Sequence, residues 1–245
     1  MPTFTRGDVS IYYEEFGRPA GFPILLIAPG GMRSAVEFWH TSPFDPTVEL
    51  APDFRVIAMD QRNAGRSQAP IGSDDGWPVY LDDQLGLLDH LGIAHSHLMG
   101  GCIGCSYCLG LLKRVPDRFA AAVLQNPIGL SNGNRPKFQG MFDEWAAELQ
   151  ARRSEIDPAR LRALGERMFD GEFVFTVSRD DVRACQTPLL VLPGNDDFHP
   201  TTTANDIVAL APHADVRSPW ARPDVVRETV TQVRAFLDRN IPPEA

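Results

Sequence analysis

The chain has 245 residues, of which 43% are hydrophobic and 22% charged, and its formal net charge is −9 at pH 7. These values are typical of a globular protein of one or two domains with a sizeable core. The negative charge argues against nucleic acid and anionic membrane surfaces as partners, because both bind basic faces. The sequence has no apolar run of about 18 residues and no apolar leader segment at its start. We therefore expect no membrane association and a cytoplasmic location.

Short apolar runs alternate with helical patterns along the chain. An N-terminal hairpin is predicted over 4–6 and 10–16, on either side of Gly7 and Asp8. Strands are predicted at 23–28, 54–59, 96–101, 120–125, 188–193 and 215–218, and helices at 35–40, 80–91, 102–114, 203–210 and 224–240. This alternation implies an α/β fold, with a mostly parallel central sheet and helices on both faces.

The segment 131–183 interrupts the alternation, because polar and helix-favouring residues dominate it. We interpret it as an inserted helical cap, and 1–130 together with 184–245 as the core. Aromatic side chains recur through the cap and are expected to supply mostly its own packing. The alternative is that they line an apolar pocket; they are Phe138, Phe142, Trp145, Phe169, Phe173 and Phe175.

One stretch carries the clearest chemical signal. Residues 100–104 read Gly-Gly-Cys-Ile-Gly between a predicted strand and a predicted helix, which is G-x-S-x-G with cysteine in place of serine. That pattern is a nucleophile elbow, in which strand and helix approach closely and a strained turn presents one side chain. A thiol at a helix N-terminus is also stabilised as the reactive thiolate. The alternative for Cys102 is a small buried apolar residue.

The four cysteines are Cys102, Cys105, Cys108 and Cys185, and the crowding of three of them suits reduced thiols in the cytosol. The first three also have the spacing of iron–sulfur ligands or of a thiol redox motif. The apolar pattern at 109–112 favours a continuous helix instead, so we expect neither a metal nor a cofactor. Redox pairing of Cys102 with Cys105 stays open as an alternative.

Four local marks, in this order, resemble the α/β-hydrolase fold over nearly the whole chain. They are Pro-Gly-Gly-Met at 29–32, Asp-Gln-Arg-Asn-Ala-Gly-Arg-Ser at 60–67, the elbow at 100–104, and Gly-Asn-Asp-Asp at 194–197. The resemblance implies a nucleophile that attacks a carbonyl carbon, with two backbone amides holding the oxyanion. A shared fold alone does not settle function.

The resemblance also assigns roles by position. Cys102 is the nucleophile, and the oxyanion donors are Ile103 and Gly31, with Met32 as a substitute for Gly31. Asp197 is the acid, although Asp196 is interchangeable with it at this stage. Two tryptophans are plausible walls of the substrate site, namely Trp39 and Trp220.

The histidine departs from the family pattern. The resembling family carries its base after the last strand, but residues 218–224 read Ser-Pro-Trp-Ala-Arg-Pro-Asp, and no histidine follows them. His199, two residues after Asp197, is our candidate for the base, and His40 is the second candidate. The alternative for His199 is an ordinary turn before a helix. Dienelactone hydrolases similarly use cysteine at the elbow, but they keep the late histidine.

These features predict a cysteine-dependent hydrolase of a small ester, thioester or lactone, acting through an acyl-enzyme on Cys102. A thiol is partly ionised without help, so it depends less on a base than serine does. The alternatives are a ligand-binding or sensor protein on the same scaffold, and an enzyme that cleaves carbon–carbon bonds. The expected partner is a small acyl substrate, and the oligomeric state is left open, a dimer included.

Overall fold

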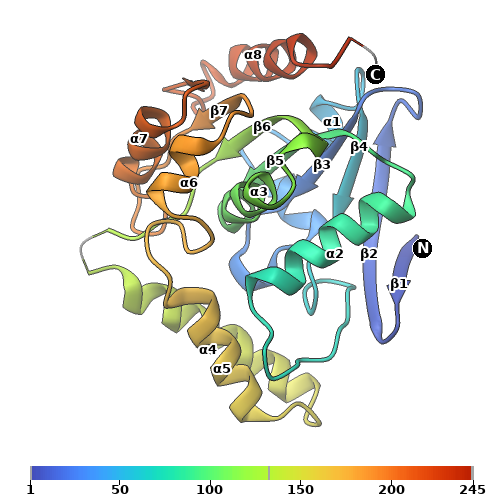
Figure 1. Ribbon diagram of the computed structural model, residues 1–245, viewed down its shortest axis with the longest axis vertical. Helices are drawn as coiled ribbons and strands as arrows, with labels where there is room; N and C mark the ends of the chain where they lie inside the picture. The colour runs from blue at the N-terminus through green and yellow to red at the C-terminus, as the bar shows by residue number, and fades with distance from the viewer. Residues whose placement is uncertain (1, 132, 244–245) are drawn as a thin grey trace.

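The computed structural model describes residues 2–131 and 133–243, and in this part of the chain the strands form an eight-stranded sheet (Figure 1). The predicted core and cap ranges also contain Met1, Asn132, Glu244 and Ala245, which lie outside the described residues. The strand order is β1-β2-β4-β3-β5-β6-β7-β8. β1 and β2 pair antiparallel, as do β2 and β4, whereas the pairs from β4 through β8 are parallel. The mostly parallel sheet predicted from the sequence is confirmed.

The strands follow the predicted apolar runs closely. Their bounds are β1 Thr3–Arg6, β2 Val9–Gly17, β3 Pro23–Ile27, β4 Arg55–Met59, β5 Ser96–Gly101, β6 Phe119–Gln125, β7 Leu189–Leu192 and β8 Ala214–Val216. The central strands are buried on both faces, which explains why they read as continuous apolar runs rather than alternating ones.

The α-helices are α1 Pro46–Glu49, α2 Trp77–His90, α3 Ile103–Arg114, α4 Arg135–Arg152, α5 Pro158–Phe169, α6 Arg179–Ala184, α7 Thr201–Leu210 and α8 Val226–Arg239. Three 3₁₀ turns join them: η1 Gly31–Arg33, η2 Val36–Thr41 and η3 Pro116–Arg118. The predicted helix at 35–40 is therefore a 3₁₀ turn. α2 begins three residues before its predicted start because Pro78 suits a first turn, where its missing N–H leaves no bond unmade.

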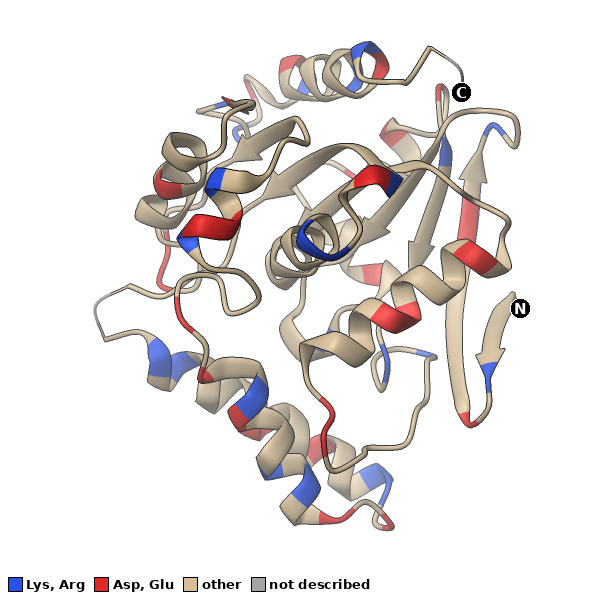
Figure 2. Cartoon of the chain, viewed as in Figure 1, with Lys and Arg blue, Asp and Glu red and all other residues tan. Residues whose placement is uncertain are grey.

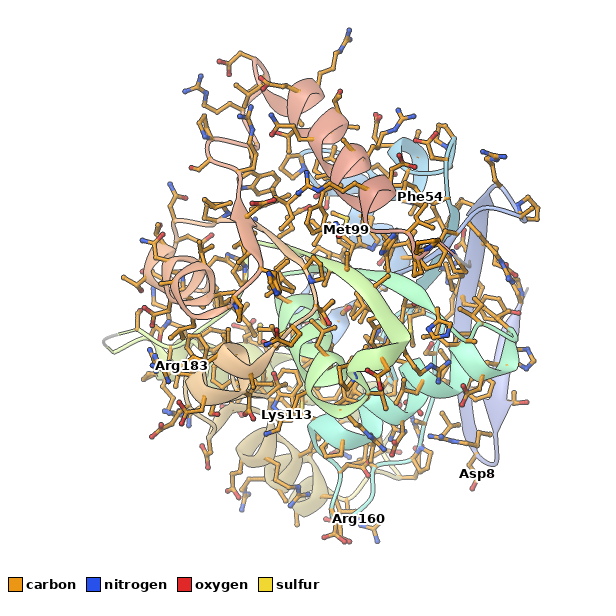
Figure 3. The ribbon with its side chains drawn as sticks, turned by 45° about the horizontal axis from the view of Figure 1, so that its top comes forward. Asp8, Phe54, Met99, Lys113, Arg160 and Arg183 are labelled. Atoms are coloured by element: carbon orange, nitrogen blue, oxygen red, sulfur yellow. The ribbon has the colours of Figure 1, made fainter. Side chains whose placement is uncertain are left out.

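Alternate residues of the central strands belong to two separate hydrophobic cores, one on each face of the sheet. Along β3, Ile24 and Leu26 face the core that α8 and η2 cover, whereas Leu25 and Ile27 face the core beneath α2, α3 and α7. Met99 of β5 belongs to the α8 side of the sheet, as Figure 3 shows. Both faces of the sheet are thus covered, and the loops at the carboxyl ends of its parallel strands are left to form a site.

α4 and α5 pack side by side as a separate layer at the bottom of Figure 1, far from α8. Figure 2 shows both charge signs interspersed along these two helices. α6 falls within the predicted cap range but packs against α7 instead. Within the range 131–183, the compact part is therefore the α4–α5 pair.

Arginines tie this helix pair to the loops that follow β3 and β4. Arg33 of η1 pairs with Glu148 of α4 through two hydrogen bonds, of 2.9 and 2.8 Å. At the far end of the pair, Arg160 of α5 donates to the carbonyl of Ile71 at 3.2 Å, and Figure 3 shows its position at that extremity. These contacts hold the cap against the carboxyl edge of the sheet.

Candidate active site

Cys102 stands on a strained turn between β5 and α3. Its φ of 56° and ψ of −117° lie in a region that side-chain-bearing residues rarely occupy, as expected of a nucleophile elbow. A Cβ on Gly104 would lie 2.1 Å from the carbonyl oxygen of Ile27, so only glycine allows α3 to approach β3 this closely. The Cys102 N–H donates to the carbonyl of Gln125 at 2.9 Å, which fixes the turn against β6.

The loop after β7 carries a histidine–aspartate pair. Nδ1 of His199 lies 2.8 Å from both Oδ1 and Oδ2 of Asp196. Oδ1 of Asp196 also accepts the backbone N–H groups of Phe198, at 2.9 Å, and of His199, at 3.0 Å. The carboxylate therefore builds the turn and orients the imidazole at the same time.

Asp197 is directed elsewhere, and this differs from the sequence expectation that made it the acid. Its side chain is 69% exposed and pairs with Lys137 of α4. Asp196 and Asp197 are adjacent, so their side chains leave the turn in different directions, and the backbone of the turn selects Asp196. The carboxylate that contacts His199 is therefore that of Asp196, the alternative that the sequence left open, and not that of Asp197.

Cys102 and His199 influence each other's ionisation. Burial by itself would raise the pKa of the Cys102 thiol, but the interaction with His199 and the backbone N–H groups of Gly30 and Ile103 bring that pKa below its ordinary value. Burial opposes protonation of His199, yet Cys102 and Asp196 together raise its pKa to about 9. The contact therefore favours the thiolate of Cys102 and the imidazolium of His199 over their neutral forms.

The second ring nitrogen of His199 is the one available to Cys102. Nε2 is buried and has no hydrogen-bond partner of ordinary geometry among the described residues. Cys102 is the strongest of the groups that raise the pKa of His199, so the thiol and the imidazole are in electrostatic contact.

Two helix starts converge on Cys102. η1 begins directly after Gly30, whose φ of 115° turns the chain out of β3, and α3 begins at Ile103. The first N–H groups of a helix have no partner within it, so both starts offer free donors. Gly31 belongs to this turn, whereas Met32 has only 2% of its surface exposed and packs into the core.

The structure also shows the surroundings of the remaining candidate residues, two of which are buried. Trp39 is fully buried, and its ring supports the elbow from below, 3.1 Å from where a Cβ on Gly101 would lie. Trp220 is buried in the same core and donates from Nε1 to the carbonyl of Pro193 at 2.8 Å. Both tryptophans therefore pack in the core on the α8 side of the sheet, and their role as walls of a substrate site stays a prediction. His40 pairs with Asp45 at 2.6 Å and is 55% exposed.

Two side chains that the sequence analysis did not single out for the site cover Gly30 and Gly31, the loop after β3 that is predicted to hold the oxyanion and is called the oxyanion loop below. A Cβ on Gly31 would lie 2.5 Å from Sδ of Met141, a residue of α4. A Cβ on Gly30 would lie 3.1 Å from the ring of Phe38, which also lines a groove of about 540 Å³ between α4 and the loops after β3 and β4. The residues next to Met141 in the sequence do not indicate that it contacts Gly31. Only the helical register of the segment 135–152 could have predicted this contact.

The aromatic residues of the cap pack mainly with one another. Phe138 stacks with Phe169 at 5.8 Å between ring centroids and meets Phe198, next to His199, at 5.2 Å. All six predicted cap aromatics are buried. This cluster supplies the packing of the cap, the first of the two interpretations, and it joins the cap to the loop that carries His199.

The other thiols of α3 are packed in the core. Cys105 donates from Sγ to the carbonyls of Gly100, at 3.1 Å, and Gln125, at 3.2 Å, and burial raises its pKa well above the ordinary value. Cys108 is fully buried in the same continuous helix. Within residues 2–131 and 133–243, we find no group of three or more His, Cys, Asp or Glu side chains arranged to hold a metal ion. None of the described helices is both long and apolar enough to cross a membrane.

Comparison with known proteins agrees with this geometry. The sequence model of the α/β-hydrolase fold family matches residues 23–183, and the chain belongs to this family. A 2-hydroxymuconate semialdehyde hydrolase of Pseudomonas sp. (strain CF600) is 34% identical over 113 residues, which is 46% of this chain and 38% of that protein. A proline iminopeptidase of Neisseria meningitidis serogroup A (serotype 4A, strain DSM 15465 / Z2491) is 30% identical over 117 residues, 47% of this chain and 36% of that protein. The chain therefore aligns with less than half the length of these curated relatives.

Solved structures resemble the whole chain. The meta-cleavage product hydrolase CumD of Pseudomonas fluorescens IP01 superposes with a TM-score of 0.72, covering 98% of each chain at 19% identity. The enol-lactonase of Burkholderia xenovorans LB400 gives a TM-score of 0.69 at 18% identity, covering 97% of this chain and all of the other, 100%. At these identities the likeness concerns the fold alone.

Proposed function

We propose that the protein is a cysteine-dependent hydrolase of small esters, thioesters or lactones that works through an acyl-enzyme on Cys102. The pairing of Cys102 with His199, which lowers the pKa of the thiol and raises that of the imidazole, is the observation that carries the proposal. Membership of the α/β-hydrolase fold family supports it, as does the relative named as a 2-hydroxymuconate semialdehyde hydrolase.

In the first half of the cycle, the Cys102 thiolate attacks the carbonyl carbon of the substrate. The N–H groups of Ile103 and Gly31 stabilise the oxyanion, since both belong to helix starts beside the sulfur. The tetrahedral intermediate then collapses, and the bond from carbon to the leaving oxygen or sulfur breaks. His199 gives its proton to the leaving group, which leaves a thioester and a neutral imidazole.

In the second half, the neutral His199 takes a proton from water as the water oxygen attacks the thioester. The carbon–sulfur bond breaks, and the thiolate and imidazolium are restored as the carboxylic acid leaves. Asp196, hydrogen-bonded to Nδ1, orients the ring and stabilises its charged form in this scheme. Acid and base thus lie on the loop after β7, and the family's late histidine is replaced by His199.

The substrate is expected to carry a small acyl group. Met141 and Phe38 contact the two glycines of the oxyanion loop, and this arrangement supports a short acyl chain rather than a long one. We further propose that residues 131–183 act as the cap domain over the core, and that the protein works in the cytoplasm on a small-molecule substrate. The four cysteines are free thiols, which agrees with a reducing compartment.

The test uses small p-nitrophenyl and thiophenyl esters with the wild type, Cys102→Ala and the matched buried-thiol control Cys108→Ala. We expect a burst of leaving group and an acyl mass on Cys102 in the wild type, and neither in Cys102→Ala. Cys108→Ala should keep both.

Full turnover by Cys102→Ala would overturn the proposal, and tight binding without turnover in the wild type would favour a ligand-binding protein instead. Carbon–carbon cleavage would be recognised from its products when a vinylogous diketone is supplied.

A further inference from the structure

Asn126 occupies an unusual position at the carboxyl edge of the sheet. It directly follows β6, and its φ of 50° lies in the left-handed region that few non-glycine residues adopt. On one side of it, Gln125 accepts the N–H of Cys102 at 2.9 Å. On the other side, the N–H of Asn126 itself donates to the carbonyl of Leu192 at 2.7 Å, on β7. Asn126 therefore stands between the elbow and the loop that carries His199.

The side chain of Asn126 is directed to the histidine loop. Its Oδ1 lies 3.2 Å from the point where a Cβ on Gly194 would be, and Cβ of His199 lies 2.4 Å from that same point. The residue is half-buried, and its carboxamide makes no hydrogen bond to the described residues. A carboxamide offers both a donor and an acceptor, so an unused one beside a nucleophile and its base is free to bind another molecule.

We propose that Asn126 is the positioning residue for the water that hydrolyses the Cys102 thioester. This role rests on the proposed function. In the deacylation step, water gives one proton to Nε2 of His199 while its oxygen forms a bond to the acyl carbon and the carbon–sulfur bond breaks. In this role the carboxamide of Asn126, which has no hydrogen bond to the described residues and lies beside the loop that carries His199, accepts the second hydrogen of that water. Two anchoring points fix the direction of attack, whereas His199 alone would leave the water free to rotate.

The proposed role also explains why Asn126 has a strained, left-handed backbone conformation. A residue in the left-handed region turns its side chain away from the normal course of the strand, and strain of this kind is retained where the surroundings require it. The residue types that tolerate the conformation best are glycine, asparagine and aspartate. Of these, glycine has no side chain and aspartate would add a negative charge next to the Cys102 thiolate. Asparagine is the residue that satisfies both the backbone and the water.

The same preference allows side chain and backbone to be separated by experiment. Asn126→Gly keeps the conformation and removes the carboxamide, and Asn126→Asp keeps both the conformation and an acceptor oxygen. Stopped-flow kinetics with a p-nitrophenyl ester measures acylation from the burst and deacylation from the steady phase, and intact mass measures the acyl-enzyme. We expect Asn126→Gly to acylate within about twofold of wild type and to deacylate about 10- to 100-fold more slowly. Asn126→Asp should lose less than Asn126→Gly in deacylation.

An external thiolate provides the decisive control, because it attacks the thioester without proton removal by His199 and without an oriented water. Decay of the acyl-enzyme in excess thiolate should be equal in wild type and Asn126→Gly. Deacylation by water at the wild-type rate in Asn126→Gly would overturn the role of Asn126, and so would an equal slowing with water and with thiolate. If the wild type forms no acyl-enzyme at all, the proposed function itself fails, and that result is distinct from an acyl-enzyme whose decay ignores Asn126.

Discussion

His199 presents Nδ1 to both carboxylate oxygens of Asp196, at 2.8 Å each, although the two residues are only three positions apart. A histidine and its orienting acid are thus supplied by one turn. The carboxylate also accepts two backbone N–H groups of that turn, so the orientation of the imidazole is set locally. The other ring nitrogen is left for Cys102.

Asp196 and Asp197 form a natural matched pair of variants. Asp196→Asn should lower the pKa of His199 and reduce kcat/KM by about 10²- to 10⁴-fold, the range found when the acid of a triad is neutralised. Asp197→Asn removes only an exposed contact with Lys137 and should stay within about twofold. Steady-state kinetics on both variants checks this. Equal losses in the two, or a larger loss in Asp197→Asn, would contradict the assignment of Asp196.

The ion pair predicts a bell-shaped pH profile of kcat/KM. The acidic limb reflects formation of the Cys102 thiolate, whose pKa is lowered, so this limb should lie below the pH at which an ordinary thiol ionises. The alkaline limb reflects loss of the leaving-group proton from His199, whose pKa is about 9, so activity should fall as the pH passes that value. Alkylation of Cys102 by iodoacetamide measures the thiolate directly. In His199→Ala its midpoint should move to higher pH, and an unchanged midpoint would mean that His199 does not stabilise the thiolate.

The raised pKa of His199 also links stability to pH. Because the folded-state pKa, about 9, exceeds the ordinary value of 6.5, protonation favours the folded state. This contribution is complete below about pH 6.5 and disappears as the pH rises through 9. Urea unfolding between pH 6 and 10 should show a loss of stability in the wild type that is smaller in His199→Ala. A parallel course of the two proteins would contradict the pairing.

Met141 should govern which acyl groups enter. Its Sδ lies over Gly31 of the oxyanion loop, so Met141→Ala opens space where the acyl group would extend. We expect the preference for butyryl over acetyl esters, measured as the ratio of kcat/KM values, to rise about tenfold, since one or two methylenes in an apolar pocket carry this much discrimination. Met141→Leu, which keeps the volume, should leave the ratio nearly unchanged. An unaltered ratio in Met141→Ala would place the acyl group elsewhere.

Alanine substitutions at two helical glycines, Gly104 and Gly140, should change the free energy of unfolding in opposite directions. A Cβ on Gly104 would lie 2.1 Å from the Ile27 carbonyl, so Gly104→Ala should destabilise the fold by about 3 kcal/mol or more. Gly140 lies within α4 with no atom within 4 Å of such a Cβ, so Gly140→Ala should stabilise by about 0.5–1 kcal/mol. Urea unfolding of both variants measures the two free energies. A Gly104→Ala protein of wild-type stability would mean that α3 can move away from β3.

The sequence was most informative where one residue type is physically required. The glycines around Cys102 indicated close contact of strand and helix, and the continuous apolar runs indicated strands buried on both faces. It was less informative where contacts come from distant segments. Met141 and Phe38 reach the oxyanion loop because of how α4 and η2 pack, and nothing in their neighbouring residues encodes this. The choice between Asp196 and Asp197 likewise depended on the conformation of one turn.

Position in a family pattern did not indicate how deeply the two tryptophans are buried. Trp39 and Trp220 follow the right strands to reach a substrate, yet both turn into the core on the α8 side of the sheet. A large apolar side chain gains more from full burial than from lining an open site. Their placement beneath the elbow and beneath Pro193 makes them supports of the two loops that meet at the sulfur.

The placement of Asp196 and His199 on one turn has a consequence for how the chain tolerates change. Because neither residue comes from the loop after β8, the segment from β8 through α8 carries no proton-handling group in this scheme. Substitutions in this segment, or fusion of another protein to it, should therefore leave the proposed chemistry intact, provided that the core contacts of α8 are kept. The vulnerability is concentrated instead between Gly194 and Pro200, where a single proteolytic cut or inserted residue would disable acid and base together.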